Sequence, residues 1–245
     1  MSFLTRFQLI KKADKSAAVE KLIKDSTPDY DFFLLIILSV LMATFGLLID
    51  STAVVIGSML IAPLLYPVIS LALGMAMSDH QLIGRSLYTI LKAAVFGVAA
   101  AAIATLFFTP VEGIFNNEIL SRTEPSLPYF LIAIVAGLAV TYAMADPDRS
   151  EAFPGIAVSV ALIPPLAVLG IGIASFEWTV ITGSLVLFLV NIIGIVFAGM
   201  VSFSLMNLYE TRRVAKTTIK KEEKRIEQEN QKIEKIKEEM DEAVQ

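Results

Sequence analysis

An apolar segment from Ser51 to Met77 contains the stretch Gly57-Ser58-Met59-Leu60-Ile61-Ala62-Pro63-Leu64-Leu65-Tyr66-Pro67. Proline has no backbone N–H and its ring clashes with the preceding helical turn, so two prolines four residues apart predict a broken helix. In a bilayer, broken backbone is tolerated only where protein or a water-filled cavity satisfies the freed polar groups. A second apolar segment, Ala152–Ala174, contains a similar break at Ile163-Pro164-Pro165-Leu166. The sequence therefore predicts a membrane protein with two discontinuous helices.

The composition also indicates a membrane protein. Hydrophobic residues make up 56% of the 245 residues, charged residues only 18%, and the mean hydropathy is +0.70, which lies outside the range of soluble globular domains. Of the 20 Lys and Arg residues, six precede residue 32 and ten follow residue 206. Basic clusters beside apolar segments are typical of cytoplasmic anchors, so no nucleic-acid partner is expected. With no cysteine and a single histidine, no metal or other cofactor is expected either.

Six apolar segments are predicted to cross the membrane, because each can cover a hydrocarbon layer about 30 Å thick. They are Phe32–Ile49, Ser51–Met77, Ser86–Phe108, Tyr129–Ala145, Ala152–Ala174 and Thr179–Leu208. If all six cross, both termini, Arg85 and Arg149 lie on the cytoplasmic side and Arg122 lies outside, as the positive-inside rule requires. If both broken segments are re-entrant, the termini stay inside but the acidic loop of residues 109–128 also moves inside. We therefore favour six crossings.

The chain divides into three regions. Residues 1–31 mix apolar residues with lysines and are predicted to form an amphipathic segment at the cytoplasmic surface. Residues 32–208 form the transmembrane domain, and residues 209–245 form a charged helix. In that helix Ile219, Ile226, Ile233 and Met240 recur every seven residues, which predicts a coiled coil joining copies of a homo-oligomer. Glutamates at intervening positions leave a solvated single helix as the alternative.

The transmembrane domain contains an internal repeat. A shift of 101 residues lays residues 32–108 on residues 129–208 and matches Ser58 with Ser159 and Pro63 with Pro164. Three crossings per repeat is an odd number, so the second repeat must be inverted relative to the first. Inverted repeats that meet at discontinuous helices are the architecture of many secondary transporters. We therefore expect an all-α fold of six transmembrane segments, arranged as an inverted 3+3 repeat, followed by a cytoplasmic helix.

Three motifs resemble the hallmarks of one known family. They are Leu-Ile-Asp-Ser-Thr-Ala-Val-Val-Ile-Gly-Ser-Met-Leu-Ile-Ala-Pro-Leu-Leu-Tyr-Pro at 48–67, Phe-Pro-Gly-Ile-Ala-Val-Ser-Val-Ala-Leu-Ile-Pro-Pro-Leu-Ala-Val-Leu-Gly at 153–170, and the step from Asn191 to Gly194. Together they resemble the prokaryotic membrane family catalogued as domain of unknown function 389. The resemblance implies a multi-pass protein of the plasma (inner) membrane of a bacterium or archaeon. It implies no activity, so the function must come from the residues.

The candidate site lies where the two breaks meet. Half-helix N-termini favour anions and freed carbonyls favour cations, so the breaks could bind a small solute or ion. The candidate residues are Gly57, Ser58, Pro63, Tyr66, Pro67, Ser159, Pro164, Pro165 and Asn191. The alternative is that the small residues let helices pack closely and the prolines only kink them. Asn191 could equally join two helices, and Tyr66 could equally pack. We favour a binding site because the breaks occupy matching places.

The expected function is a transporter or channel-like protein for a small solute or ion, with its pathway between the broken helices. No Asp, Glu or His lies at hydrocarbon depth, which disfavours coupling through a carboxylate at the centre of the membrane. No nucleophile–base pair, phosphate loop or metal cluster is recognisable, so an enzyme is not expected. The alternative is a non-transporting oligomeric membrane scaffold or sensor that acts through its cytoplasmic helix.

Overall fold

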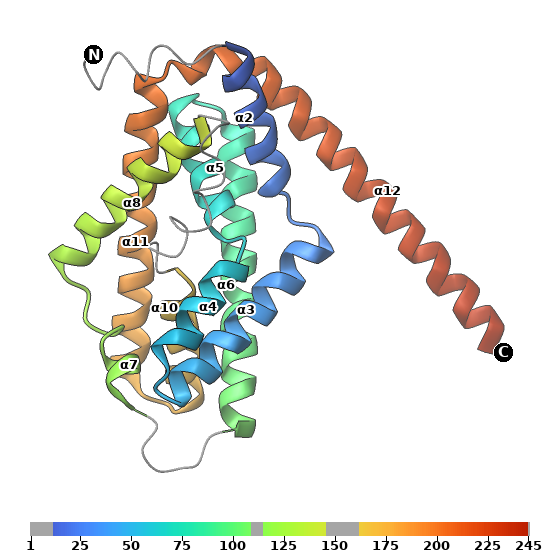
Figure 1. Cartoon of the computed structure of the whole chain (residues 1–245). Helices are drawn as coiled ribbons and strands as arrows, with labels where there is room; N and C mark the ends of the chain where they lie inside the picture. The colour runs from blue at the N-terminus through green and yellow to red at the C-terminus, as the bar shows by residue number, and fades with distance from the viewer. Residues whose placement is uncertain (1–11, 109–114, 146–161, 245) are drawn as a thin grey trace.

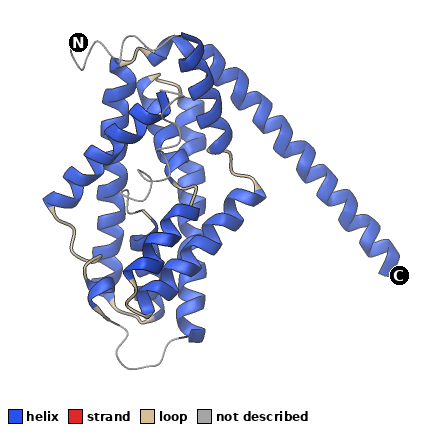
Figure 2. Cartoon of the chain, viewed as in Figure 1, coloured by secondary structure: helices blue, strands red, loops and turns tan. Residues whose placement is uncertain are grey.

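The computed structural model describes residues 12–108, 115–145 and 162–244. Within those ranges all regular structure is helical (Figure 2). Four helices are long and apolar enough to cross a membrane: α3 (Tyr30–Leu48), α6 (His80–Phe108), α8 (Leu127–Ala145) and α11 (Trp178–Leu205). The bent pair α4 (Thr52–Ile61) and α5 (Leu65–Ala76) brings the number of candidate spans to five. The prediction of an all-α protein with several apolar, membrane-length helices is confirmed.

The remaining helices are shorter or more polar than the candidate spans. They are α2 (Lys12–Asp25), α7 (Asn117–Leu120), α10 (Ile163–Ala174), the short 3-10 helix η2 (Leu208–Thr211) and α12 (Arg212–Val244). Helix α10 is strongly apolar but has only 12 residues, too few to cross a bilayer alone. It begins directly at Ile163-Pro164-Pro165, the motif of the second predicted break. The residues that precede this motif, 146–161, lie outside the described residues.

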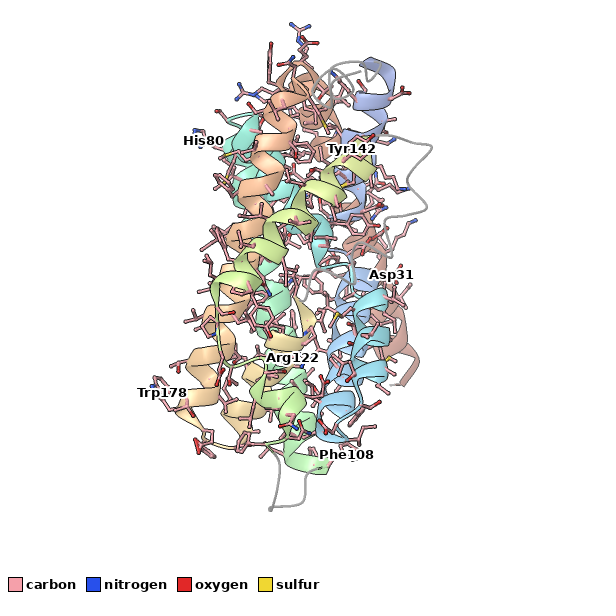
Figure 3. The ribbon with its side chains drawn as sticks, turned by 60° about the vertical axis from the view of Figure 1, so that its left-hand side comes forward. Asp31, His80, Phe108, Arg122, Tyr142 and Trp178 are labelled. Carbon is pink, nitrogen blue, oxygen red and sulfur yellow. The ribbon has the colours of Figure 1, made fainter. Side chains whose placement is uncertain are left out.

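Helices α6 and α11 are the two longest candidate spans, with 29 and 28 residues. Figure 3 shows His80, the first residue of α6, near one end of the molecule, and Phe108 and Trp178 near the other. The two long helices therefore run in opposite directions. Helices α5 and α10 each pack against both of them, while α3 packs against α4, α6 and α10, and α8 packs against α11. In Figure 1 α5 lies in the upper half of the bundle and α10 in the lower half.

Three of the helix–helix connections are the same tight turn. In each, a residue with left-handed backbone follows the helix, and the next N–H donates to a glycine carbonyl five residues earlier, as in a Schellman motif. The left-handed residues are Asp50, Ser78 and Phe176. The bonds run from Ser51 to Gly46 (2.8 Å), from Asp79 to Gly74 (2.9 Å) and from Glu177 to Gly172 (3.0 Å). A Cβ on any of these glycines would lie 3.0 Å from the next helix, so glycine lets consecutive helices fold back in contact.

The repeated turns do not follow the predicted shift of 101 residues. Helices α5 and α10 have 12 residues each and begin at residues 65 and 163, which are 98 residues apart; α6 and α11 begin at 80 and 178, again 98 apart. The shift of 101 residues, which pairs Ser58 with Ser159, is therefore wrong for these elements. A shift of 98 pairs Pro67 with Pro165. Apolar sequence gives several near-equal alignments, and the turn glycines distinguish between them.

The amphipathic helix α2 packs along the bundle. Its apolar residues Val19, Leu22 and Ile23 are buried, and the helix contacts α5, α8 and α12. The Lys15 Nζ donates a hydrogen bond of 2.6 Å to the carbonyl of Met206, where the C-terminal end of α11 attracts a positive charge. These contacts bring the C-terminal end of α2 beside α5.

Helix α12 docks on the bundle through a set of polar residues that we call the polar belt: Thr27, Asp29, Arg85, Glu222 and Arg225. Asp29 caps α3 by accepting from the Phe32 N–H (2.9 Å), and its other oxygen accepts from Arg225 (2.8 Å). Arg225 also pairs with the buried Glu222 (3.3 Å), and Arg85 donates to the Thr27 hydroxyl (2.7 Å). The far half of α12 extends away from the bundle (Figure 1).

Candidate functional site

The first residues of α5 and α10 lie at the same level of the bundle. Helix α5 ends in the turn where Gly74 contacts Ile83, and Gly170 of α10 contacts Ala101. At about 1.5 Å per residue, Ile83 and Ala101 are about 27 Å apart along α6. By the same spacing, α5 starts about 13 Å before Gly74 and α10 about 10 Å before Gly170. The two half-helices therefore start within a few ångströms of each other along the bundle axis and point in opposite directions.

Proline determines which backbone groups are free at the breaks. Neither N-cap residue, Leu64 or Leu162, makes a side-chain capping bond. Prolines occupy first-turn positions of both half-helices, and these positions would otherwise carry unpaired N–H donors. At the end of α4, Pro63 cannot donate to the Met59 carbonyl. The first break therefore frees carbonyl acceptors, and each half-helix start still carries the positive end of a helix dipole.

The break residues of both half-helices are enclosed by the bundle. Pro67, Pro164 and Pro165 are buried, while Pro63 and Tyr66 are half-buried. The Tyr66 N–H donates to the Pro63 carbonyl (3.1 Å), which tightens the link between α4 and α5. One and a half turns into α5, the buried Ser70 hydroxyl has no hydrogen-bond partner among the residues that the structure describes. Buried hydroxyls are ordinarily paired, so this group is suited to bind water or a solute.

Asn191 lies on α11 at the level of the breaks. In the α10–α11 turn Gly172 contacts Ile181. Asn191 is ten residues further along α11, about 15 Å, and Ile163 is nine residues back along α10, about 14 Å. Asn191 is only 5% exposed. The predicted convergence of Asn191 with the second break is therefore consistent with the packing of α10 on α11.

Gly57 and Ser58 lie one to two turns away from the first break, at the contact between α3 and α4. A Cβ on Gly57 would lie 3.0 Å from the Met42 side chain. The Ser58 hydroxyl is fully buried and donates to the Val55 carbonyl (2.6 Å), while the Ser58 carbonyl accepts from Ser39 (2.7 Å). These are helix-packing contacts. Ser159, the other predicted serine, lies outside the described residues.

Asp25 is a residue near the first break that sequence reasoning does not select. It ends α2, which packs against α5, and its carboxylate lies within electrostatic range of the Tyr66 hydroxyl. Burial raises the pKa of the Asp25 carboxyl above its ordinary value, against the opposing charges of Lys21 and Lys24. Its one signal in the sequence is the apolar face of α2, which is predicted to lie on the membrane surface and which the structure buries in the bundle.

Substituting Asp25→Asn is expected to stabilise the protein at neutral pH. The raised pKa means that the folded chain binds more protons than the unfolded chain at pH values just above 3.8. The stability of the wild-type protein therefore falls as the pH rises from 3.8 to the pKa of Asp25 in the folded state. The loss persists at neutral pH. The variant's gain in thermal unfolding midpoint over wild type should grow from about pH 4 to about pH 7. Glu20→Gln, at an exposed position of the same helix, is the control; equal shifts in the two variants would contradict the burial of Asp25.

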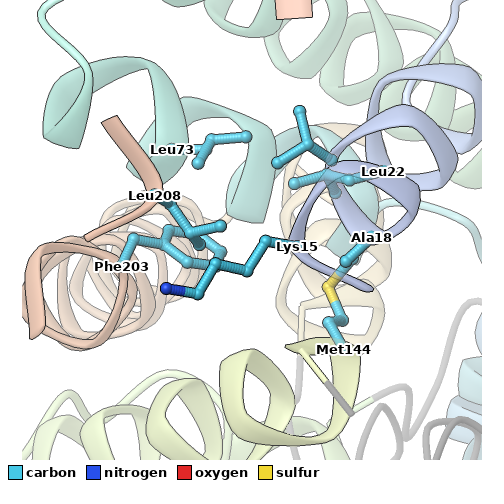
Figure 4. Close-up of a pocket in the computed structure, with 8 residues that line it drawn as sticks. Lys15, Ala18, Leu22, Leu73, Met144, Phe203 and Leu208 are labelled. Carbon is cyan, nitrogen blue, oxygen red and sulfur yellow. The ribbon is translucent and has the colours of Figure 1, made fainter. Parts of the chain in front are cut away.

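A separate recess lies between α2, α5, α8 and α11 (Figure 4). Lys15, Leu22, Leu73, Met144 and Phe203 are among its lining residues. Its volume is about 10 Å³, room for about one water molecule. It is therefore a packing defect beside the docked α2 rather than a solute site. Among the described residues, no group of three or more His, Cys, Asp or Glu could hold a metal ion.

Comparisons with known proteins give a family and a relative. The family model described as domain of unknown function (DUF389) matches residues 59–197, which include both breaks and Asn191. An uncharacterized protein of Methanocaldococcus jannaschii, MJ0678, is 34% identical over 171 residues, covering 70% of this chain and 52% of the relative. The chain thus spans about half the length of this relative. No solved structure matches.

Proposed function

Because this chain belongs to the DUF389 family, whose description records no activity, we propose from its geometry that it is a transporter or channel-like protein for a small solute or ion. One observation carries the proposal: two half-helices of opposite direction begin at one level of the bundle, beside a buried asparagine. Discontinuous helices that meet in this way form the substrate sites of many secondary transporters. The proposal includes no chemistry on the solute and no enzymatic activity.

The proposed architecture is six crossings in an inverted 3+3 repeat. The matched lengths of α5 and α10, the identical turns after them and the opposite directions of α6 and α11 support it. The bend of 54° between α4 and α5 also supports a crossing, since a re-entrant segment must reverse its direction. The fifth crossing would combine α10 with residues 146–161, which lie outside the described residues. Both termini would then be cytoplasmic, in the plasma membrane of a prokaryote.

Cysteine labelling tests this topology. The chain has no native cysteine, so each introduced thiol reports one position. Asn117→Cys should react with a membrane-impermeant maleimide on intact cells, whereas Gln81→Cys and Gln245→Cys should react only after permeabilisation. The reason is that α7 lies at the Phe108 end of the bundle and Gln81 at the His80 end (Figures 1 and 3). Reaction of Gln81→Cys on intact cells would contradict six crossings.

Flux through reconstituted protein tests the function without a known substrate. Proteoliposomes should be compared with protein-free liposomes in two assays. Stopped-flow light scattering reports the flux of small neutral solutes such as urea and glycerol. Currents on a solid-supported membrane report the flux of Na⁺, K⁺ and Cl⁻. We expect protein-dependent flux in one of the two. Absence of flux for every solute, with folded protein in the liposomes, would contradict this set of substrates and favour the second candidate.

The second candidate is an oligomeric membrane scaffold or sensor that acts through α12. It is favoured by the length of α12, 33 residues, and by its extension beyond the polar belt. The seam isoleucine Ile219 is buried where α12 packs on α2. Further out, the seam isoleucines Ile226 and Ile233 are half-buried, and Ile236, three residues beyond Ile233, is 54% exposed. The outer part of the seam is thus available to join a second copy. Tail-dependent assembly without flux would support this second function.

A further inference from the structure

The polar belt marks a boundary on the face formed by α3 and α6. Arg85 and Asp29 lie in the belt, paired with Thr27 and Arg225. From two residues beyond Arg85 onward, α6 carries exposed apolar side chains: Leu87, Leu91 and Val95 are each more than half exposed. On α3, Leu34 is also more than half exposed. A change from paired charges to exposed apolar side chains is what a membrane–water interface requires.

Lys92 lies on the apolar side of this boundary. It is seven residues beyond Arg85, about 10 Å along α6. Its ammonium stands 4.7 Å from the centre of the Phe33 ring and 5.9 Å from those of Tyr88 and Phe96. Among the described residues no carboxylate forms an ion pair with it. The rings hold the cation in place but do not neutralise its charge.

The surface beside Lys92 is open toward the belt. Side chains on a helix lean toward its N-terminus, and for Lys92 that direction leads to the polar belt. Tyr88, one turn closer to the belt, is 60% exposed, and its hydroxyl can donate a hydrogen bond. Gly84, one further turn along the same stripe, is exposed, and a Cβ there would meet no atom within 4 Å. A group the size of a lipid headgroup can therefore approach both donors from the interface.

We propose that Lys92 and Tyr88 bind the phosphate of an anionic phospholipid, whose acyl chains lie along Leu91, Val95 and Leu34. The ammonium then gains the negative partner that the described residues do not give it. The phosphate lies at the level where paired charges give way to apolar side chains. The Phe33 and Phe96 rings, which contact each other edge to face at 5.4 Å, hold the lysine stem below the headgroup. This site is independent of the proposed transport function.

Lipid titration of the full-length protein in detergent tests the proposal. Thermal unfolding is followed against dioctanoyl phosphatidylglycerol, which is anionic, and dioctanoyl phosphatidylcholine, which carries no net charge. Wild type should bind the phosphatidylglycerol at least about fivefold more tightly, the factor expected from one basic residue near an anionic surface. Lys92→Gln should lose this preference, and Tyr88→Phe should reduce it. Lys92→Arg should keep it, which separates loss of charge from loss of fold.

Two controls make the test specific. Lys216→Gln removes one charge from an exposed position of α12, and it should keep the preference for phosphatidylglycerol. Inorganic phosphate, added in excess, should not compete with the lipid. An unchanged preference for phosphatidylglycerol in Lys92→Gln would overturn the proposal. The contacts with the aromatic rings would then be the only role of the Lys92 side chain. Full competition by inorganic phosphate would also overturn it, because the ligand would then be a soluble anion.

Discussion

Replacing Asn191 by leucine is expected to lower flux strongly while leaving most of the protein folded. The two side chains have similar volumes, so packing on α11 changes little, but leucine can neither donate nor accept a hydrogen bond. A polar solute at the break would then lose a buried partner, at a cost of about 1–3 kcal/mol. That cost corresponds to a decrease in rate of about 5- to 150-fold. The measurement is flux in proteoliposomes, normalised to folded protein.

A matched control separates a site from a structural bond. Ser184→Ala also removes a buried polar group from α11, but the Ser184 hydroxyl donates to the Val180 carbonyl of its own helix (2.7 Å). Its loss should leave flux within about twofold of wild type, because only a bond within one helix is removed. If Asn191→Leu retains flux and lowers the unfolding midpoint, Asn191 joins two helices and the pathway lies elsewhere.

Substituting Gly170→Ala is expected to destabilise the protein by forcing α10 away from α6. A Cβ at this position would clash with the Ala101 Cβ and would lie 2.7 Å from the Val98 carbonyl oxygen. Backbone cannot yield as a flexible side chain does, so the two helices must separate. Overpacking of this kind costs about 1–3 kcal/mol, more than the roughly 1 kcal/mol that alanine gains over glycine in a helix. A lower midpoint of thermal unfolding is therefore expected.

Gly84→Ala is the control for this substitution. It lies on the partner helix α6, where an added Cβ meets nothing within 4 Å. The helix-propensity gain is then unopposed, so the unfolding midpoint should stay constant or rise. Equal midpoints for Gly170→Ala and wild type would show that α10 does not seat against α6. The opposed arrangement of the two half-helices would then be in doubt.

Proline and apolar length made much of the fold predictable. Pro63 and Pro164 remove backbone donors wherever they stand in space, so the end of α4 and the start of α10 could be located from covalent chemistry alone. The apolar segments likewise predicted the four membrane-length helices. The spacing of 98 residues that relates α5 to α10 and α6 to α11 could not be predicted in the same way, because chance matches such as Ser58 with Ser159 favour another shift. The turn glycines distinguish the two shifts only through their 6→1 hydrogen bonds.

The candidate site was predictable only in part. The break residues Pro63, Tyr66 and Pro67 could be found because the feature that breaks the helix also frees its carbonyls. Ser58 is close to Pro63 in sequence, but the structure places its hydroxyl in the contact between α3 and α4. Asp25 could not be found because its helix has the composition of a surface segment. Only tertiary packing, which composition does not encode, brings that helix against α5.

A cysteine at the first break would report whether water reaches the space between the broken helices. This measurement needs no known substrate. Ala62 is half-buried between α4 and α5, while Val95 lies at nearly the same level of the bundle on the apolar outer face, 61% exposed. Methanethiosulfonates react with the thiolate, which forms only where water reaches the sulfur. In liposomes we predict that charged methanethiosulfonates modify Ala62→Cys at least about tenfold faster than Val95→Cys, because solvation favours the thiolate at the break. Lack of reaction at Ala62→Cys from both sides, while Asn117→Cys reacts, would contradict a pathway between the broken helices.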